Sequence, residues 1–240
     1  ASKAAEEDPL NRKKSFHLHG RKLPYDQSQF FEAHLSTAQV LAKTRAMGVT
    51  MTSYLAAAQM LAAYQEMPAL ERGKVISVSL PVNLRSYYGT ETARNFFNSI
   101  RISWVFRGDE TLETLKDERV KARMDGFEKL EQMPGIKLVP LFIKNAVVNL
   151  FNTLEAKKVT LTISNMGRIS LQKELQPYIK GFTAFCSSPT AFTTVCSYGD
   201  DLVLGTTWAF RSTEMLKNFY RRLSAEGLDI TLYATEVDGE

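Results

Sequence analysis

Histidine is the side chain best suited to proton transfer and metal binding near neutral pH, and the chain has three. His17 and His19 share one face of a predicted strand, and His34 lies in the next predicted strand. A His-x-His pair with a third histidine is a pattern that can bind zinc. Three histidines in 240 residues is nevertheless a low count, and no supporting residues are evident around them. We therefore expect hydrogen-bonded or surface histidines, with no metal site and no permanently bound cofactor.

A short polar sequence that follows an apolar strand is a second candidate for chemistry. Residues 162–167 read Thr-Ile-Ser-Asn-Met-Gly, which places Ser164 and Asn165 where the strand predicted over residues 159–163 ends. The order Ser-Asn-x-Gly is typical of a turn that closes a strand. By turn chemistry alone, both residues are structural.

Three further polar residues border the preceding pair of predicted strands. Residues 80–85 read Leu-Pro-Val-Asn-Leu-Arg, so Arg85 follows the end of a strand. Asn95 and Asn98 flank two phenylalanines where the next strand begins, and an asparagine there can satisfy stray backbone groups and hold the adjoining loop. These residue types indicate an ion pair or hydrogen bond for Arg85 and a turn-fixing role for both asparagines.

Other common catalytic patterns are absent from the sequence. It contains no phosphate-binding GxxxxGK[ST] loop and no GxSxG nucleophile turn. The carboxylate pairs at residues 109–110 and 200–201 lie in predicted turns, where we expect solvated loop charges.

Cys186 and Cys196 have apolar surroundings and no histidine nearby in sequence, which predicts two buried thiols in a reducing, cytoplasmic setting.

The periodicity of the apolar residues predicts an α+β fold, with a mixed sheet of about five or six strands and helices packed on one face. Pro81 is expected to end the strand that contains it. Strands are predicted over residues 15–18, 30–35, 75–82, 98–106, 159–163, 181–186, 192–197, 202–207 and 228–235, and helices over residues 37–46, 50–65, 111–132, 141–156 and 213–226.

Composition excludes several classes of protein. The chain is 44% hydrophobic and 23% charged, with a formal charge of +4 whose basic residues are dispersed, so we expect no nucleic-acid partner. The most apolar helical stretch, residues 138–154, is broken by Pro140 and Lys144, and no signal peptide is visible, so we expect no membrane span. Residues 1–14 are expected to form a linker stub and residues 15–240 a single domain.

Three stretches, in order, resemble the chloramphenicol acetyltransferase-like family. They are residues 80–85 with the Phe-Phe-Asn of residues 96–98, then residues 162–167, then the strand of residues 202–207 with the helix that follows it. The resemblance includes dihydrolipoamide acyltransferases, condensation domains of nonribosomal peptide synthesis, and alcohol and wax-ester acyltransferases. Residues 96–98 keep only the aromatic and asparagine part of the family's turn, because the family's glycine is replaced.

The resemblance implies specific roles for these residues. In the family, a histidine that follows the last strand acts as general base, but residues 208–213 read Trp-Ala-Phe-Arg-Ser-Thr, without histidine or aspartate. The chain therefore resembles the C-terminal half of a two-half enzyme whose HHxxxDG histidine lies in an N-terminal half, on the same full-length chain or another subunit. Ser164 then corresponds to a hydroxyl that donates a hydrogen bond to the oxyanion of the tetrahedral intermediate. The substrate-binding positions implied are Asn165, Asn98, Asn95 and Arg85.

The implied enzyme transfers an acyl group from a coenzyme A or carrier-protein thioester to the hydroxyl or amine of a small molecule. This half would supply the tunnel wall and the acceptor pocket and would be inactive alone. Two alternatives remain open at this point. One is half of a condensation domain that acts on carrier-protein thioesters, and the other is a non-catalytic binding or scaffold domain that keeps the fold.

Overall fold

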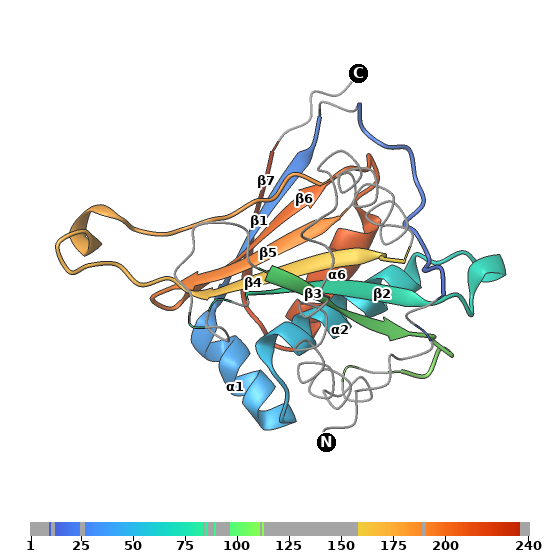
Figure 1. Ribbon diagram of the computed structural model, residues 1–240, viewed down its shortest axis with the longest axis horizontal. Helices are drawn as coiled ribbons and strands as arrows, with labels where there is room; N and C mark the ends of the chain where they lie inside the picture. The colour runs from blue at the N-terminus through green and yellow to red at the C-terminus, as the bar shows by residue number, and fades with distance from the viewer. Residues whose placement is uncertain are drawn as a thin grey trace, which may run out of the picture.

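The computed structural model describes residues 13–24, 27–83, 97–110, 158–188 and 191–235, together with positions 10, 85, 89 and 112. Within these residues, seven strands form one mixed sheet in the order β3-β2-β4-β5-β6-β1-β7 (Figure 1). β4 runs parallel to β2 and β5, and the other neighbours pair antiparallel. The strands are β1 (Gln29–Ser36), β2 (Ile76–Asn83), β3 (Phe97–Trp104), β4 (Leu161–Arg168), β5 (Phe192–Tyr198), β6 (Asp201–Trp208) and β7 (Ile230–Ala234).

The helices cover one face of this sheet, as the sequence predicted for an α+β fold (Figure 1). They are α1 (Thr37–Met47), α2 (Met51–Gln65) and α6 (Glu214–Ala225), with 3-10 turns η2 (Ala69–Glu71) and η5 (Gln176–Tyr178). The sheet has seven strands, against the five or six that the sequence suggested, and β7, within the strand predicted over residues 228–235, forms the edge beside β1. The predicted helices over residues 111–132 and 141–156 lie outside the described residues. No described helix has the length and apolar character needed to cross a membrane.

Local signals account for the boundaries of the helices. The Ser36 hydroxyl accepts a hydrogen bond from the Gln39 amide at the start of α1, and Gly48 ends that helix in the left-handed conformation that glycine adopts freely. The Thr50 hydroxyl caps α2 in the same way through the Ser53 amide. In α6, the buried residues recur at helical spacing and face the core, while the opposite side is charged.

A buried polar chain ties two helices to the centre of the sheet. The Gln59 side-chain amide of α2 donates to the Thr193 hydroxyl of β5 at 2.7 Å. Thr193 is 3.0 Å from the Thr206 hydroxyl of β6, which is 3.3 Å from the Tyr220 hydroxyl of α6. Burial raises the pKa of Tyr220 to about 12, so the phenol is neutral throughout the physiological range.

Three sequence predictions about strands are corrected. Residues 15–18 make only an isolated bridge, between Ser15 and Val75, instead of a strand. Residues 181–186 pair with none of the described strands. Pro81 lies inside β2, opposite Ser99 of β3, and does not end the strand. The described pairing of β2 with β4 stops at Ser79, so a proline two residues later removes no hydrogen bond from that ladder.

Asp200, in the turn between β5 and β6, caps α1 from outside the helix. Its carboxylate accepts hydrogen bonds from the Ser36 hydroxyl at 2.7 Å and from the Ala38 amide at 2.8 Å. These two bonds, the hydroxyl first, lower the pKa of Asp200 below its ordinary value. A lowered folded-state pKa contributes stability above the unfolded-state pKa, and this contribution is lost as the pH falls through the folded-state value.

We expect Asp200→Asn to destabilise the protein at pH 7 and the difference from the wild type to shrink as the pH falls below about 4, the ordinary aspartate pKa. Urea unfolding of both proteins at pH 7, 5, 4 and 3 measures this difference. Asp109→Asn, at an exposed position, is the matched control and should show no such pH-dependent gap. A gap that stays constant from pH 7 to pH 3 would contradict the capping role.

Candidate functional site

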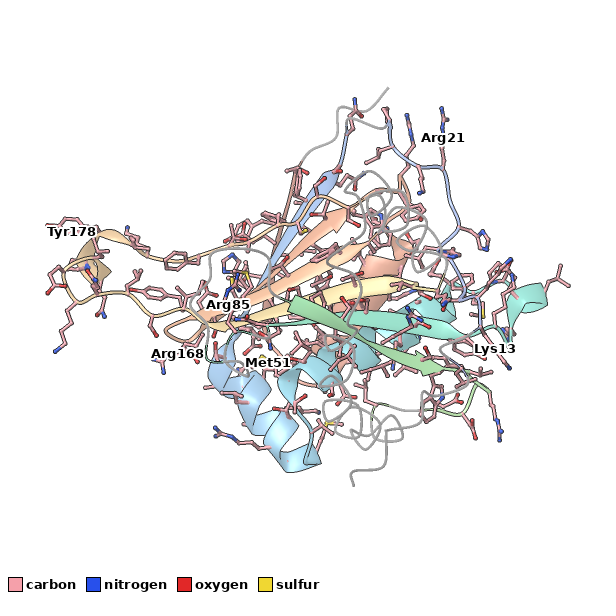
Figure 2. All side chains as sticks on the ribbon, in the orientation of Figure 1. Lys13, Arg21, Met51, Arg85, Arg168 and Tyr178 are labelled. Atoms are coloured by element: carbon pink, nitrogen blue, oxygen red, sulfur yellow. The ribbon has the colours of Figure 1, made fainter. Side chains whose placement is uncertain are left out.

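Three of the sequence-predicted site residues, Arg85, Asn98 and Asn165, lie at one end of the sheet. Because β2 and β4 are parallel, their C-terminal ends lie at the same edge, and β3 begins there opposite the end of β2. Arg85 follows β2 at this edge, where Arg168 also ends β4 (Figure 2). The backbone of Asn98 pairs with Val82 in the first ladder positions of β3. The side chain of Asn98, and Asn95 altogether, lie outside what the structure describes.

Ser164 lies on the open face of the sheet, the face opposite the helices. Its neighbour Ile163 is fully buried in the core on the helix side, and side chains alternate along a strand, so Ser164 points the other way. The residue is half-buried and pairs with Thr194 of β5. β4 continues to Arg168, so Ser164 lies within the strand and not at its end as the sequence suggested.

Asn165 is held by the fold on the helix side of β4. Its side-chain amide donates to the Thr52 hydroxyl in the first turn of α2 at 2.8 Å, and its side-chain oxygen accepts from the Gly167 amide at 2.8 Å. The register with β5 shifts between Asn165 and Gly167, and Gly167 has a φ of 77°, a conformation that favours glycine. Asn165 therefore fixes the bulge that ends the regular part of β4.

Arg85 makes local contacts of the kind that its residue type predicted. Its backbone amide and its Nη1 both donate to the Asn83 side-chain oxygen, at 3.1 and 3.2 Å. Asn83 is the last residue of β2, so these bonds shape the exit from the strand. Arg85 is half-buried at the same edge of the sheet as Asn165.

Residues 208–213 make hydrogen bonds that hold the local structure together. The Trp208 indole donates to the Ser212 carbonyl at 2.8 Å, and the backbone of Ala209 and Arg211 bonds to residues 21–23. None of the side chains in this stretch has an ordinary pKa near neutrality, so none is suited to act as a general base. The histidine that the family places after this strand has no substitute here.

The histidines are hydrogen-bonded or exposed, as expected. His19 Nε2 lies 3.0 Å from a Glu71 oxygen, and His17 is exposed. His34, on the open face of β1, is held on both sides: Nδ1 is 3.0 Å from the Asp201 carboxylate and Nε2 is 2.9 Å from Glu32 Oε1. Among the described residues, no group of side chains is suited to hold a metal ion.

The Glu32–His34–Asp201 cluster is a feature that the sequence analysis missed. Alternation along the strand already places Glu32 and His34 on one face, which was the available signal. Asp201 joins them only because β1 pairs antiparallel with β6, with Ser36 opposite Asp201. That pairing joins segments far apart in the sequence and has no local signature.

Residues 169–188, here called the arm, leave the sheet after β4 and return before β5. The arm projects well beyond the sheet and carries η5 at its tip (Figure 1). Leu175 and Tyr178 on it are 45% and 83% exposed, unusually high for large apolar side chains. The described part of the chain thus presents an extended apolar element with nothing packed against its tip.

The returning part of the arm crosses the open face of the sheet. The Phe182 carbonyl is 3.5 Å from Cys196 Sγ, and the Phe182 ring meets Tyr198 of β5 edge-on. Gly205 of β6 lies directly under the arm, since a Cβ on this glycine would come within 2.1 Å of the Ala184 carbonyl oxygen. The arm therefore sits at backbone contact distance over β6.

The position of the arm explains why one cysteine is buried and the other is exposed. Cys196 is buried beneath it, and burial, followed by the nearby charges of Asp201 and Glu32, raises the pKa of its thiol. Cys186 is exposed on the arm itself, so the prediction of a buried thiol is wrong there. Its sequence surroundings are apolar, but they lie on a segment that packs by one side only.

Comparison with known proteins identifies the fold. No family model and no curated protein sequence matches the chain. The nonribosomal peptide synthetase FmoA3 matches with a TM-score of 0.61 and 12% identity, over 91% of this chain and 23% of the synthetase. The trichothecene 15-O-acetyltransferase TRI3 from Fusarium sporotrichioides matches with a TM-score of 0.51 and 14% identity, over 88% of this chain and 49% of that chain.

A third structure, TRI101 from F. sporotrichioides complexed with coenzyme A and T-2, matches with a TM-score of 0.50 and 10% identity, over 90% of this chain and 54% of that chain. The chain therefore spans about half the length of TRI3 and of TRI101 and less of the synthetase. At identities this low, these structural matches show a shared fold and nothing finer. It is the chloramphenicol acetyltransferase-like α+β fold that the sequence motifs suggested.

Proposed function

We propose that this chain, which has a chloramphenicol acetyltransferase-like fold, is the C-terminal half of a coenzyme A-dependent acyltransferase of the alcohol or O-acetyltransferase type. The observation that carries the proposal is the extent of the match. The fold of the acetyltransferase TRI3 is reproduced over 88% of this chain but only 49% of that protein. The catalytic histidine of an HHxxxDG motif would lie in the other half, which is consistent with the absence of a base in residues 208–213.

The chemistry assigned to this half is stabilisation and binding, without proton transfer. In the complete enzyme, the histidine takes the proton of the acceptor hydroxyl, whose oxygen attacks the thioester carbonyl. The C–S bond then breaks, and the histidine returns the proton to sulfur as coenzyme A leaves as the thiol. The carbonyl oxygen becomes negatively charged in the tetrahedral intermediate. The Ser164 hydroxyl, on the open face and outside the helix-side core, donates a hydrogen bond to this oxyanion.

The edge of the sheet that holds Arg85, Asn98 and Asn165 would border the acceptor and thioester. Asn165 is already bonded to Thr52 and Gly167, so its contribution is to hold the backbone of the β4 bulge in place. The arm supports the presence of a partner half, because its exposed Leu175 and Tyr178 are suited to pack against another domain. Association of that half with this one would bury these side chains.

The test is an assay of thiol release from acyl-coenzyme A with the chain alone and with the complete protein. We expect residues 1–240 to give no turnover above the buffer rate and the complete protein to turn over, with activity lost when the HHxxxDG histidine is changed. Turnover by residues 1–240 that disappears when His17, His19 or His34 is replaced would overturn the proposal.

A second function, half of a condensation domain, is favoured by one observation, the higher TM-score of 0.61 to a nonribosomal peptide synthetase. Its donor would be an acyl group on the phosphopantetheine of a carrier protein, and its acceptor an amine or hydroxyl. Supplying the complete protein with acyl-coenzyme A and with an acylated carrier protein in parallel separates the two functions. A complete protein inactive with both donors would favour a binding or scaffold domain.

A further inference from the structure

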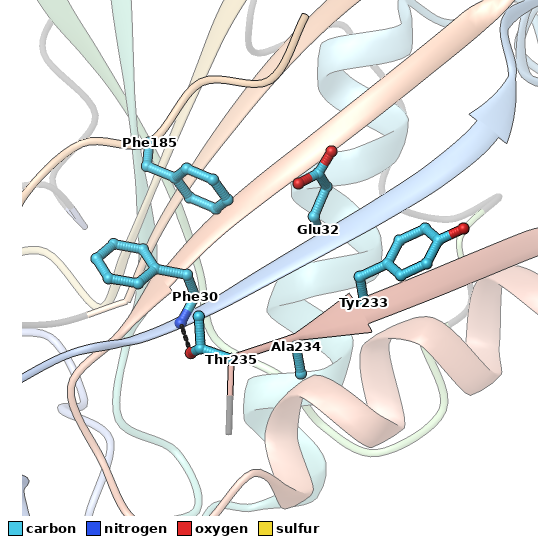
Figure 3. A pocket seen from close by; sticks show the side chains of 6 residues that line it. All are labelled: Phe30, Glu32, Phe185, Tyr233, Ala234 and Thr235. Atoms are coloured by element: carbon cyan, nitrogen blue, oxygen red, sulfur yellow. Dashed lines mark hydrogen bonds between the residues drawn. The ribbon is translucent and has the colours of Figure 1, made fainter. Parts of the chain in front are cut away.

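A pocket lies on the open face near the β7 edge of the sheet, between β1, β7 and the arm, with β5 and β6 separating β1 from the β4 strand that carries Ser164 (Figure 3). Its volume is about 380 Å³, within the range of small-molecule sites. Three aromatic rings, one carboxylate and two small residues line it. They are Phe30, Glu32, Phe185, Tyr233, Ala234 and Thr235.

The aromatic walls are held in place by contacts among the lining residues and with His34. Phe185 of the arm meets Phe30 of β1 edge-on, with ring centroids 5.1 Å apart. Tyr233 of β7 meets the His34 ring edge-on at 5.5 Å. Thr235 closes the base through hydrogen bonds with the Phe30 backbone at 3.0 Å (Figure 3). The rings therefore line an open groove, with Tyr233 and Phe185 partly exposed to solvent.

Glu32 supplies the charge. Its Oε1 lies 2.9 Å from His34 Nε2, which orients the carboxylate, and among the described contacts Oε2 has no hydrogen-bond partner. The cluster of Glu32, His34 and Asp201 joins two carboxylates to one imidazole, so acidic groups outnumber basic groups in it. None of the six described lining residues is basic.

We propose that this pocket binds an organic cation, of the class of quaternary or alkyl-substituted ammonium groups. The electron-rich faces of aromatic rings attract a cation, and a nearby carboxylate adds a full opposite charge. An anion would be repelled by Glu32. A purely apolar ligand would cover the carboxylate without offering it a partner, which is unfavourable.

The same lining residues favour an ammonium group whose nitrogen carries methyl or other alkyl groups. A primary ammonium has three donors to satisfy, and one free carboxylate oxygen with three rings satisfies few of them. A methylated ammonium spreads its charge over methyl groups that make apolar contact with Phe30, Phe185 and Tyr233. A volume of about 380 Å³ leaves room for more than the cationic head alone.

The test is a calorimetric titration of residues 1–240 with choline and with 3,3-dimethylbutan-1-ol, its uncharged analogue of the same shape, at constant ionic strength. We expect saturable choline binding and at least about tenfold weaker binding of the neutral analogue, the effect of losing the cation–ring and cation–carboxylate attraction. The readout needs no acyl transfer, so it is independent of the function proposed above.

Variants locate the site. Glu32→Gln keeps an acceptor for His34 but removes the charge, and should weaken choline binding about tenfold; Tyr233→Leu removes one ring and should weaken it about threefold or more. Tyr178→Leu, at the exposed tip of the arm, is the matched control and should bind choline normally.

If a variant fails to fold, the comparison of choline with its neutral analogue in the wild type still decides whether the proposal holds. Equal binding of the two probes, no saturable choline binding, or unchanged binding by Glu32→Gln would overturn the proposal.

Discussion

Ser164→Ala in the complete enzyme should lower the maximal rate by about one to three orders of magnitude, the effect of losing one oxyanion donor. Ser164 faces away from the helices and is half-buried, so alanine removes the hydroxyl without opening a cavity in the main core. The affinity for the acyl donor should change little, because this hydrogen bond strengthens only as negative charge develops. Steady-state kinetics with varied acyl-coenzyme A separates the two effects.

Two control variants make this result specific. Ser164→Thr keeps a hydroxyl and should retain more activity than the alanine variant. Thr162→Ala removes a hydroxyl from the same face of β4 two residues earlier and should leave the rate near that of the wild type. A Ser164→Ala enzyme that works at the wild-type rate would leave Ser164 as part of the Ser-Asn-x-Gly bulge and nothing more.

Gly205→Ala is expected to displace the arm or destabilise the fold. The added Cβ would lie 2.1 Å from the Ala184 carbonyl oxygen, and a backbone atom cannot move aside as the end of a flexible side chain can. Overpacking of this kind typically costs about 1–3 kcal/mol. Either the free energy of unfolding in urea falls by that amount, or the arm lifts from β6 and trypsin cleaves faster after Lys173.

The matched control is Gly181→Ala, the same substitution on the arm itself. A Cβ at Gly181 would be 3.8 Å from the nearest atom, an Asp201 side-chain oxygen, which is ordinary contact. This variant should unfold and be cleaved like the wild type. A Gly205→Ala protein with both properties unchanged would show that the arm is not seated on β6 in solution.

The elements that the sequence predicted well are those with local causes. Ser36 and Gly48 mark the ends of α1, and the spacing of apolar residues marks α6, because caps and helical periodicity act within a few residues. Residues 181–186 have the apolar content of a strand, but a strand requires partners. Here the segment lies across the face of the sheet, where its backbone meets no ladder.

The candidate site also has a part that could be predicted from local sequence and a part that could not. Ser164 and Asn165 could be found from a short motif, because the bulge at Gly167 has a local signature. The Glu32–His34–Asp201 cluster and the aromatic pocket depend on the pairing of β1 with β6 and β7 and on the path of the arm. These are contacts between segments far apart in the sequence, and local patterns in a single sequence do not reveal them.

The buried polar chain from Gln59 to Tyr220 constrains how this sequence can change. Replacing one member leaves a neighbour's donor or acceptor buried without a partner, which costs more than replacing both members of a pair by apolar groups. Substitutions at Gln59, Thr193 and Thr206 are therefore energetically coupled, although they lie on three different elements. During divergence of this fold, such positions should be exchanged as a set, and intermediates with a single replacement should be the least stable members of a lineage.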